Sequence, residues 1–282
     1  MGQMGNGNKL KLSTFYIHVI EGAEQLGISI DEAIERVKAM GYTAFDIGYR
    51  QNWIPVSDEE VIEKIHAHGM KIANFFVNAD FAHEFNREWF EGCINCIADS
   101  ETNLLQLTPG LFSKDDDRDA ALTRMIEAEK EVVAMGKKKG VIVTVEDFDH
   151  IDSPINTIDG VRNFFDKIPD LGFTFDTGNF YLMEENCVDA FEPFKDRLHH
   201  VHLKDRALVP FDEREFDKET YTGKKMYASP VGYGVIDMKR CIKLIKSTGY
   251  DGFLAVEHFA AKNQLDYLEK SAEFVKKAWE EA

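Results

Sequence analysis

Four side chains that could bind a metal or transfer protons stand near the ends of successive apolar runs. They are Glu146 in VTVEDF, Asp176 in FTFDTGNF, His202 in HHVHLKDR and Glu257 in LAVEHF. Carboxylate oxygens and one imidazole suit a single divalent ion such as Mn, Mg, Co or Zn. Two carboxylates that reach one carbon can also act as general base and general acid. The pattern therefore predicts a metal centre at which carboxylates could also transfer protons.

Each of these residues also has an ordinary structural explanation. Asp176 precedes Thr177-Gly178-Asn179, and an Asp in that position often caps a turn or a helix. His202, Glu146 and Glu257 could each be hydrogen-bonded or ion-paired core residues. A residue that could bind a metal stands at the end of each of four consecutive predicted strands. One shared role explains this better than four separate structural roles. We therefore predict that the four hold one ion.

Runs rich in β-forming residues alternate eight times with amphipathic helical segments. The predicted strands lie in residues 10–20, 44–49, 71–78, 103–110, 140–148, 172–180, 198–205 and 252–259. Predicted helices include residues 29–41, 57–70, 157–168, 236–249 and 264–279. The residues expected to cap helix starts are Asp31, Ser57 and Thr157. Those expected to end helices in the left-handed conformation are Gly41, Gly69, Gly140 and Gly249.

Eight strand–helix units without a linker favour one closed parallel (β/α)8 TIM barrel over residues 10–282, rather than two stacked open-sheet domains. Active sites of such barrels lie at the carboxyl ends of the strands. Glu146 shares its strand face with Thr144, whereas Val143 and Val145 face the opposite way. The other three strands divide in the same manner. We therefore expect the four polar side chains to point together into the barrel mouth.

The composition of the whole chain limits its partners. The 282 residues carry 33 basic and 50 acidic side chains, and the net charge of -17 disfavours nucleic acids and anionic membranes. No segment approaches the roughly 20 apolar residues of a membrane span. Residues 1–9 are polar and lack a hydrophobic signal segment, so they are expected to form a flexible tail. We expect a cytoplasmic protein, in which the four cysteines stay reduced, and leave open whether it forms a homo-oligomer.

Several motifs of the second half resemble those of the xylose-isomerase-like superfamily of TIM barrels. These are VTVEDF, FTFDTGNF, HHVHLKDR, GYGVID and GYDGFLAVEHF. The superfamily includes sugar phosphate isomerases and epimerases, such as D-tagatose 3-epimerase and the relatives of L-xylulose 5-phosphate 3-epimerase. The resemblance implies a metal set of Glu146, Asp176, His202 and Glu257, with the two glutamates moving protons. Many relatives have a histidine where this chain has Asn179. The DTGN segment of this chain is more similar to that of the L-xylulose 5-phosphate 3-epimerase relatives.

The leading hypothesis is a divalent-metal-dependent isomerase or epimerase of a ketose or ketose phosphate. It would transfer a proton next to a carbonyl through a metal-stabilised enediolate. Asn179, Lys204, Arg206 and His150 are candidate substrate-binding residues, and residues 206–236 are a candidate cover for the barrel mouth. The alternatives are an inosose-type dehydratase and a non-catalytic sugar-binding barrel. An endonuclease IV-like nuclease is disfavoured by the acidic charge and by Asn179, which replaces a zinc-binding histidine of that branch.

Overall fold

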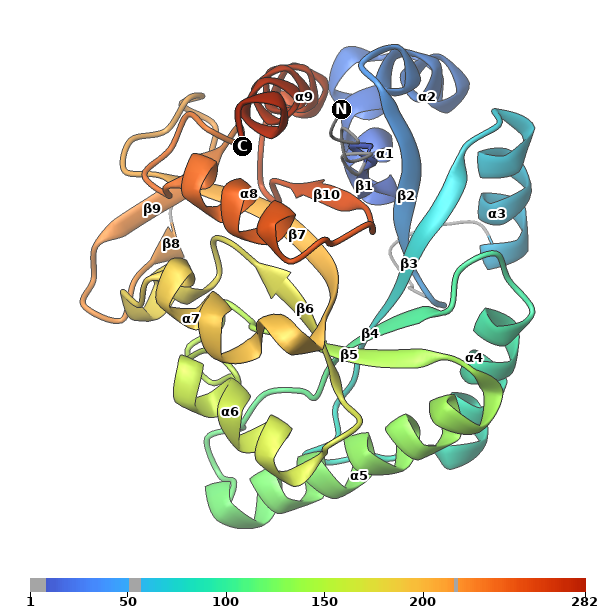
Figure 1. Ribbon diagram of the computed structural model, residues 1–282, viewed down its shortest axis with the longest axis vertical. Helices are drawn as coiled ribbons and strands as arrows, with labels where there is room; N and C mark the ends of the chain where they lie inside the picture. The colour runs from blue at the N-terminus through green and yellow to red at the C-terminus, as the bar shows by residue number, and fades with distance from the viewer. Residues whose placement is uncertain (1–8, 51–56, 216–217) are drawn as a thin grey trace, which may run out of the picture.

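The computed structural model describes residues 9–50, 57–215 and 218–282. Within these ranges, eight parallel strands close into a barrel that is surrounded by helices (Figure 1). Successive strands are neighbours, and β10 pairs with both β1 and β7, which closes the sheet. The predicted (β/α)8 barrel is therefore confirmed. The barrel strands are β1 (Leu12–Phe15), β2 (Tyr42–Gly48), β3 (Lys71–Asn78), β4 (Leu104–Thr108), β5 (Ile142–Glu146), β6 (Gly172–Asp176), β7 (Leu198–Ala207) and β10 (Leu254–Glu257).

The helices of the described chain pack against the outside of the barrel. They are α1 (Tyr16–Leu26), α2 (Ile30–Ala39), α3 (Asp58–Ala67), α4 (Arg87–Ala98), α5 (Arg118–Lys139), α6 (Ile158–Lys167), α7 (Cys187–Phe194), α8 (Met238–Ser247) and α9 (Gln264–Glu281). Two short 3-10 turns, η1 (Phe180–Met183) and η2 (Lys195–Arg197), flank α7. None of the helices in the described ranges has the length and apolar character that a membrane crossing would need.

Most of the predicted helix ends are confirmed. Ser57 and Thr157 cap α3 and α6, and the four glycines named above have φ between 68° and 99°. The prediction for Asp31 is wrong, because Ser29 caps α2 by accepting the backbone N–H of Glu32. Asp31 lies in the first turn of that helix instead.

The first predicted strand was too long. Only Leu12–Phe15 is extended, and the chain enters α1 directly at Tyr16. Tyr16 and Val19, which lie in the predicted strand, form the buried face of α1 together with Ala23. Their spacing of three and four residues is helical, and it outweighs the strand preference of aromatic and β-branched residues.

The apolar core fills the layer between barrel and helices. The alternate strand residues expected to face outward, such as Val143, Phe173, Val201 and Val256, belong to this core. After residue 207 the chain forms β8 (Lys218–Glu219) and β9 (Lys225–Ser229), and β9 pairs antiparallel with the end of β7. Part of the long segment 206–236 is therefore attached to the strand that carries His202.

Candidate metal centre

The four predicted ligands lie together at the carboxyl ends of β5, β6, β7 and β10. One ligand atom from each of Glu146, Asp176, His202 and Glu257 lies within 4.8 Å of the others, and all four residues are buried. His202 Nδ1 is 2.5 Å from Glu146 Oε1 and 3.2 Å from Glu257 Oε2. Side chains from four separate strands thus face a single point.

Asp176 combines a structural task with an open ligand position. Its Oδ1 accepts the backbone N–H groups of Gly178 and Asn179, each at 2.7 Å, so it does cap the following turn. Its Oδ2 is buried without a hydrogen-bond partner among the described residues. One carboxylate oxygen therefore fixes the turn, and the other faces the cluster unpaired.

The electrostatics of the cluster favour a cation. Burial raises the pKa of Asp176 well above its ordinary value and also raises that of Glu146. Burial acts in the same direction on Glu257, but Lys204 and His202 outweigh it and lower the pKa of that carboxyl. Buried carboxylates at this separation cannot all ionise without a compensating charge. The residues present fit a divalent ion, because such an ion would occupy the unpaired oxygen of Asp176 and neutralise two of the charges.

A hydrogen-bonded network behind the cluster fixes the ligands in place. His202 Nε2 donates to Asp46 Oδ2 at 3.3 Å, and His200 Nε2 contacts the same oxygen at 2.6 Å. Asn74 donates to both Asp46 and Gln106 at 3.2 Å. Gln106 in turn donates to Glu146. Because Asp46 can accept from Nε2, Nδ1 of His202 would be left to bind an ion in place of its 2.5 Å contact with Glu146.

The sequence analysis missed Asp46, Asn74 and Gln106. The same alternation that identified Glu146 would have placed them inside the barrel, since their neighbours Phe45, Ile47, Phe75 and Leu105 all lie in the outer core. These polar residues lie in the first half of the chain, where no other sequence motif indicates a functional site.

A cavity of about 440 Å³ opens above the cluster. Glu146 and Glu257 both line it, and three rings form an apolar wall: Phe15, Phe76 and Phe259. Asn179, Lys204 and Arg206 also line the cavity, as do Lys218, Met226, Tyr227 and Ala228 of the β8–β9 segment. The segment 206–236 thus supplies part of the wall.

His150 stands apart from this arrangement. It does not line the cavity, and its Nδ1 accepts the backbone N–H of Asp152 within a local turn. The described structure therefore gives no support to its predicted contact with substrate.

Lys204 and Arg206 are buried at the wall of the cavity, and Asp149 lies between them. Lys204 Nζ contacts Glu257 and lies 3.8 Å from Asp149 Oδ2, and Arg206 forms an ion pair with the same oxygen. Burial alone would raise the pKa of Asp149, but Lys204 and Arg206 lower it to about 2. The two cations are part of the cavity and are not solvated surface residues.

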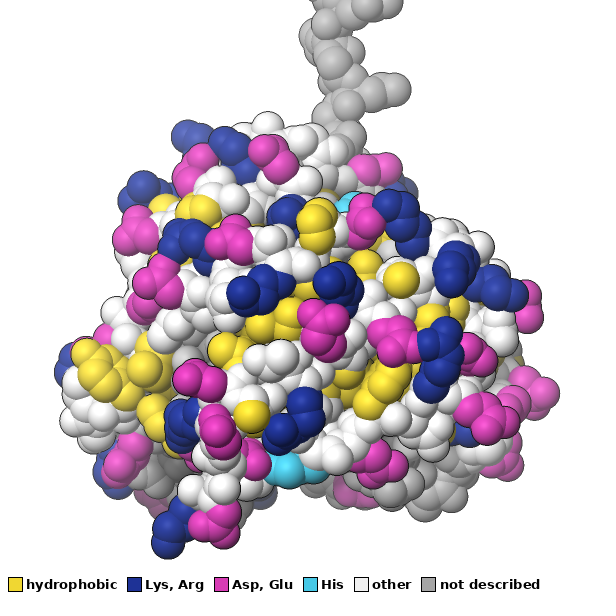
Figure 2. Space-filling model, turned by 90° about the horizontal axis from the view of Figure 1, so that it is seen from below, with side chains coloured by type: hydrophobic (Ala, Val, Ile, Leu, Met, Phe, Trp, Pro, Cys, Tyr) yellow, Lys and Arg dark blue, Asp and Glu magenta, His cyan; other side chains and the backbone are white. Residues whose placement is uncertain are grey.

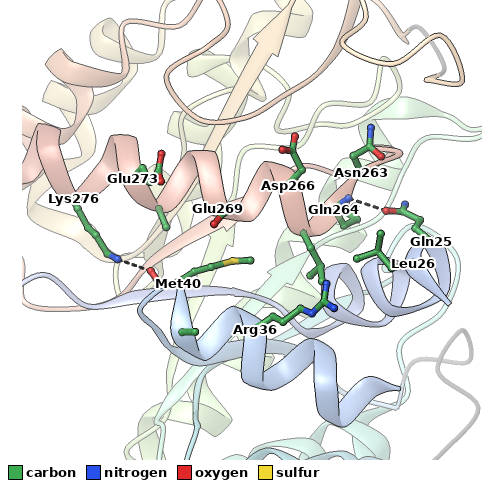
Figure 3. A pocket seen from close by; sticks show the side chains of 13 residues that line it. Gln25, Leu26, Arg36, Met40, Asn263, Gln264, Asp266, Glu269, Glu273 and Lys276 are labelled. Carbon is green, nitrogen blue, oxygen red and sulfur yellow. Dashed lines mark hydrogen bonds between the residues drawn. The ribbon is translucent and has the colours of Figure 1, made fainter. Parts of the chain in front are cut away.

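A second cavity, of about 600 Å³, lies outside the barrel between α9 and the α1–α2 pair (Figure 3). Its side chains bond across the helices: Lys276 Nζ donates to the Met40 carbonyl at 2.5 Å, and Gln25 accepts from the backbone of Gln264 at 2.8 Å. None of the acid–histidine groups found among the described residues that could hold a metal lies there. The candidate functional site is therefore the smaller cavity at the strand ends.

A closed parallel barrel with buried acids and a histidine at its carboxyl end defines the class of protein: a TIM barrel with a candidate metal centre at its mouth. The family model of the xylose isomerase-like TIM barrel matches residues 34–278, so the chain belongs to that family.

Known proteins similar to this chain include enzymes and a zinc-binding protein. An inosose dehydratase of Glaesserella parasuis serovar 5 (strain SH0165) is 25% identical over 284 residues, which cover 90% of this chain and 91% of that protein. The solved IolI protein with a zinc atom covers 96% of this chain and 99% of its own, with 15% identity and a TM-score of 0.71. A solved D-allulose 3-epimerase from Methylomonas sp. in complex with D-allulose matches 96% of this chain and 97% of its own chain, with 15% identity and a TM-score of 0.70. The two structures establish the shared fold.

Proposed function

We propose that the protein is a divalent-metal-dependent enzyme that moves a proton next to the carbonyl of a polyhydroxylated ketone. The observation that carries the proposal is the placement of Glu146 and Glu257, which lie in the candidate metal cluster and also line the cavity. Both carboxylates can thus reach a compound held there. Asp176 and His202 complete the ligand set. A structural neighbour that contains a zinc atom supports a metal in a barrel of this fold.

The roles of the side chains follow from their positions. A divalent cation held by the four residues would supply a Lewis acid that polarises the carbonyl and acidifies the adjacent C–H bond. One glutamate removes the proton as a general base, and the other returns a proton as a general acid. Lys204, which contacts Glu257, keeps that carboxyl ionised and favours the base role for it. The phenylalanine wall excludes water from the apolar side of the substrate.

The leading outcome is isomerisation or epimerisation of a ketose. It requires a proton donor and an acceptor around one substrate, and the two glutamates in the cavity provide them. The sugar-binding epimerase among the structural neighbours supports this outcome.

Dehydration of an inosose-type substrate is the second candidate. A relative named inosose dehydratase extends over 90% of the chain, which favours this outcome. The first step is the same proton removal, and the reaction then expels a hydroxyl group as water. A purely sugar-binding barrel would have no need for two carboxylates at the cavity.

Hydrogen exchange tests the proposal and separates the outcomes. The metal-loaded protein is incubated in D₂O with a panel of ketoses and inososes, and the products are followed by NMR. Deuterium next to the carbonyl of a retained or epimerised sugar supports isomerisation or epimerisation, and an unsaturated product with loss of water supports the dehydratase. Binding of these compounds with neither exchange nor water loss would leave only a binding protein.

A further inference from the structure

Three cationic side chains gather on one side of the central cavity around a single carboxylate. Lys204 and Arg206 come from the end of β7, and Lys218 comes from β8. Lys218 Nζ lies 2.9 Å from Asp149 Oδ1, and the other two cations contact Asp149 Oδ2. All three line the cavity, and Lys204 and Arg206 are each only 5% exposed. Buried cations in excess of their partners need a further negative charge.

The charges in and beside the cavity do not balance when a metal is present. Four carboxylates, those of Glu146, Asp149, Asp176 and Glu257, face the three cations. Among these seven groups, a divalent ion would leave one net positive charge if His202 is neutral. Asp46, which contacts His202 and His200 behind the cluster, is not included in this count. Three of the carboxylates belong to the candidate ligand set, and one of these, Glu257, contacts Lys204. Asp149 contacts all three cations and lies outside the ligand set. The side of the cavity next to Glu257 is therefore rich in cations.

The donors on this side are only partly used by the protein. Arg206 donates from Nε to the Gly178 carbonyl at 3.4 Å and from Nη2 to Asp149. Its Nη1 forms no hydrogen bond or ion pair with another described residue. The Lys218 side chain is 44% exposed, and one carboxylate oxygen engages it. An ammonium group has three donors and a guanidinium has five, so both side chains retain donors for a ligand.

We infer that the substrate carries an anionic group, a phosphate or a carboxylate, that binds Lys218 and Arg206 beside the metal centre. The inference rests on the proposed function, because it places this group on the compound that Glu146 and Glu257 act upon. Lys218 is the specificity-determining residue, since it alone of the three cations lies on the segment that follows the barrel strand.

Anion binding can be measured without turnover. The magnesium-loaded protein is titrated with inorganic phosphate and, separately, with acetate, by calorimetry. Wild-type protein should bind at least one of them, and Lys218→Met should weaken that binding about tenfold or more, the size of one charge-assisted hydrogen bond. The magnesium ion is common to all variants, so the difference between them isolates the lysine.

Lys224→Met is the matched control. Lys224 lies beyond β8 on the same segment, is ion-paired with Glu184 at 2.7 Å, and does not line the cavity. The Lys224→Met variant should bind phosphate and acetate as the wild type does. A preference for phosphate would indicate a phosphorylated substrate, and a preference for acetate a carboxylated one. The inference is overturned if the wild type binds neither anion or if the two variants behave alike.

The anion-binding experiment and the deuterium-exchange experiment test separate claims, so either claim can be wrong while the other holds. Anion binding that depends on Lys218, without deuterium exchange or water loss, would remove the proposed reaction and leave an anion-binding barrel. Turnover of neutral ketoses without any Lys218-dependent anion binding would keep the reaction and remove the inference about the substrate.

Discussion

At the scale of single residues, Glu257 is proposed both to bind the metal and to transfer a proton. We predict that Glu257→Gln lowers turnover by about 10²- to 10⁴-fold, the usual contribution of a general acid or base. Metal binding should weaken only modestly, because the amide oxygen can still coordinate. Steady-state rates and metal titration on the same preparation measure both effects. Turnover at a near-normal rate would remove Glu257 from the mechanism.

Asp46 is predicted to act on the metal through His202. Asp46→Asn should reduce metal affinity about 10- to 100-fold, because the carboxylate that orients Nε2 of His202 is lost. Calorimetric titration with manganese measures the change. Thr144→Val is a suitable control, since Thr144 is buried nearby and contacts Thr174 but none of the four ligands. Equal affinities in Asp46→Asn and the wild type would contradict the role assigned to Asp46.

The sequence predicts the ligand residues better than their surroundings. Alternation along a strand fixes the face of every side chain, which is why Glu146, Asp176, His202 and Glu257 were expected to converge. Asp149 and Lys218 are 69 positions apart, and their ion pair depends on how the segment after β7 folds back. No local pattern in the sequence encodes such a contact. The sequence predicts which face of a strand each side chain occupies, but it does not predict contacts between segments that are far apart in the chain.

At the scale of elements, the turn after β6 must pass very close to β7. A Cβ atom on Gly178 would lie 2.6 Å from the backbone oxygen of Lys204. We predict that Gly178→Ala lowers the free energy of unfolding by about 1–3 kcal/mol, the usual cost of overpacking. It should also displace Asp176 and so weaken metal binding. Chemical denaturation measures the first effect.

Gly92 supplies the control for this prediction. It lies within α4, and a Cβ atom there would meet no atom within 4 Å. Gly92→Ala should leave the protein as stable as before or stabilise it by about 0.5–1 kcal/mol, because alanine favours the helix. A Gly178→Ala variant as stable as Gly92→Ala would show that the turn has room to move.

The wrong predictions of strand and helix ends have identifiable physical causes. Residues 16–20 are rich in β-forming types, but burial against the barrel follows their helical spacing, and this tertiary contact decided the structure. Ser29 and Asp31 are both acceptable caps, and the choice depends on which residue takes the extended backbone before α2. Residues 1–8, which include most of the expected tail, lie outside the described part of the chain.

At the scale of the whole molecule, metal binding should stabilise the fold. The four ligands come from four strands, so an ion held by them links distant parts of the barrel. At a metal concentration of about 100 times Kd, the apparent stability should rise by about 2.7 kcal/mol. For a chain of this size we expect a Tm about 5–10 °C above that in a chelator, measured by scanning calorimetry. Asp176→Asn should lose most of the shift, and an undiminished shift would place the ion elsewhere.

The net charge of -17 is not concentrated in one acidic patch on the face shown in Figure 2. The face shown in Figure 2 has acidic and basic side chains interspersed with apolar ones. Long-range repulsion of anions is therefore weak at physiological ionic strength, where exposed charges are screened within about 8 Å. An acidic protein can for this reason still admit an anionic compound to a cationic cavity.

The extension of β7 past the rim has a consequence for protein engineering. One continuous strand carries the histidine of the reaction centre, then Lys204 and Arg206, and finally the edge to which β9 attaches. The β8–β9 hairpin attached to this edge carries Lys218 and the buried Met226, so a graft that changes the charge at position 218 should retain Met226. Such grafts should alter selectivity at the proposed anion site while the four candidate ligands on the barrel strands stay in place.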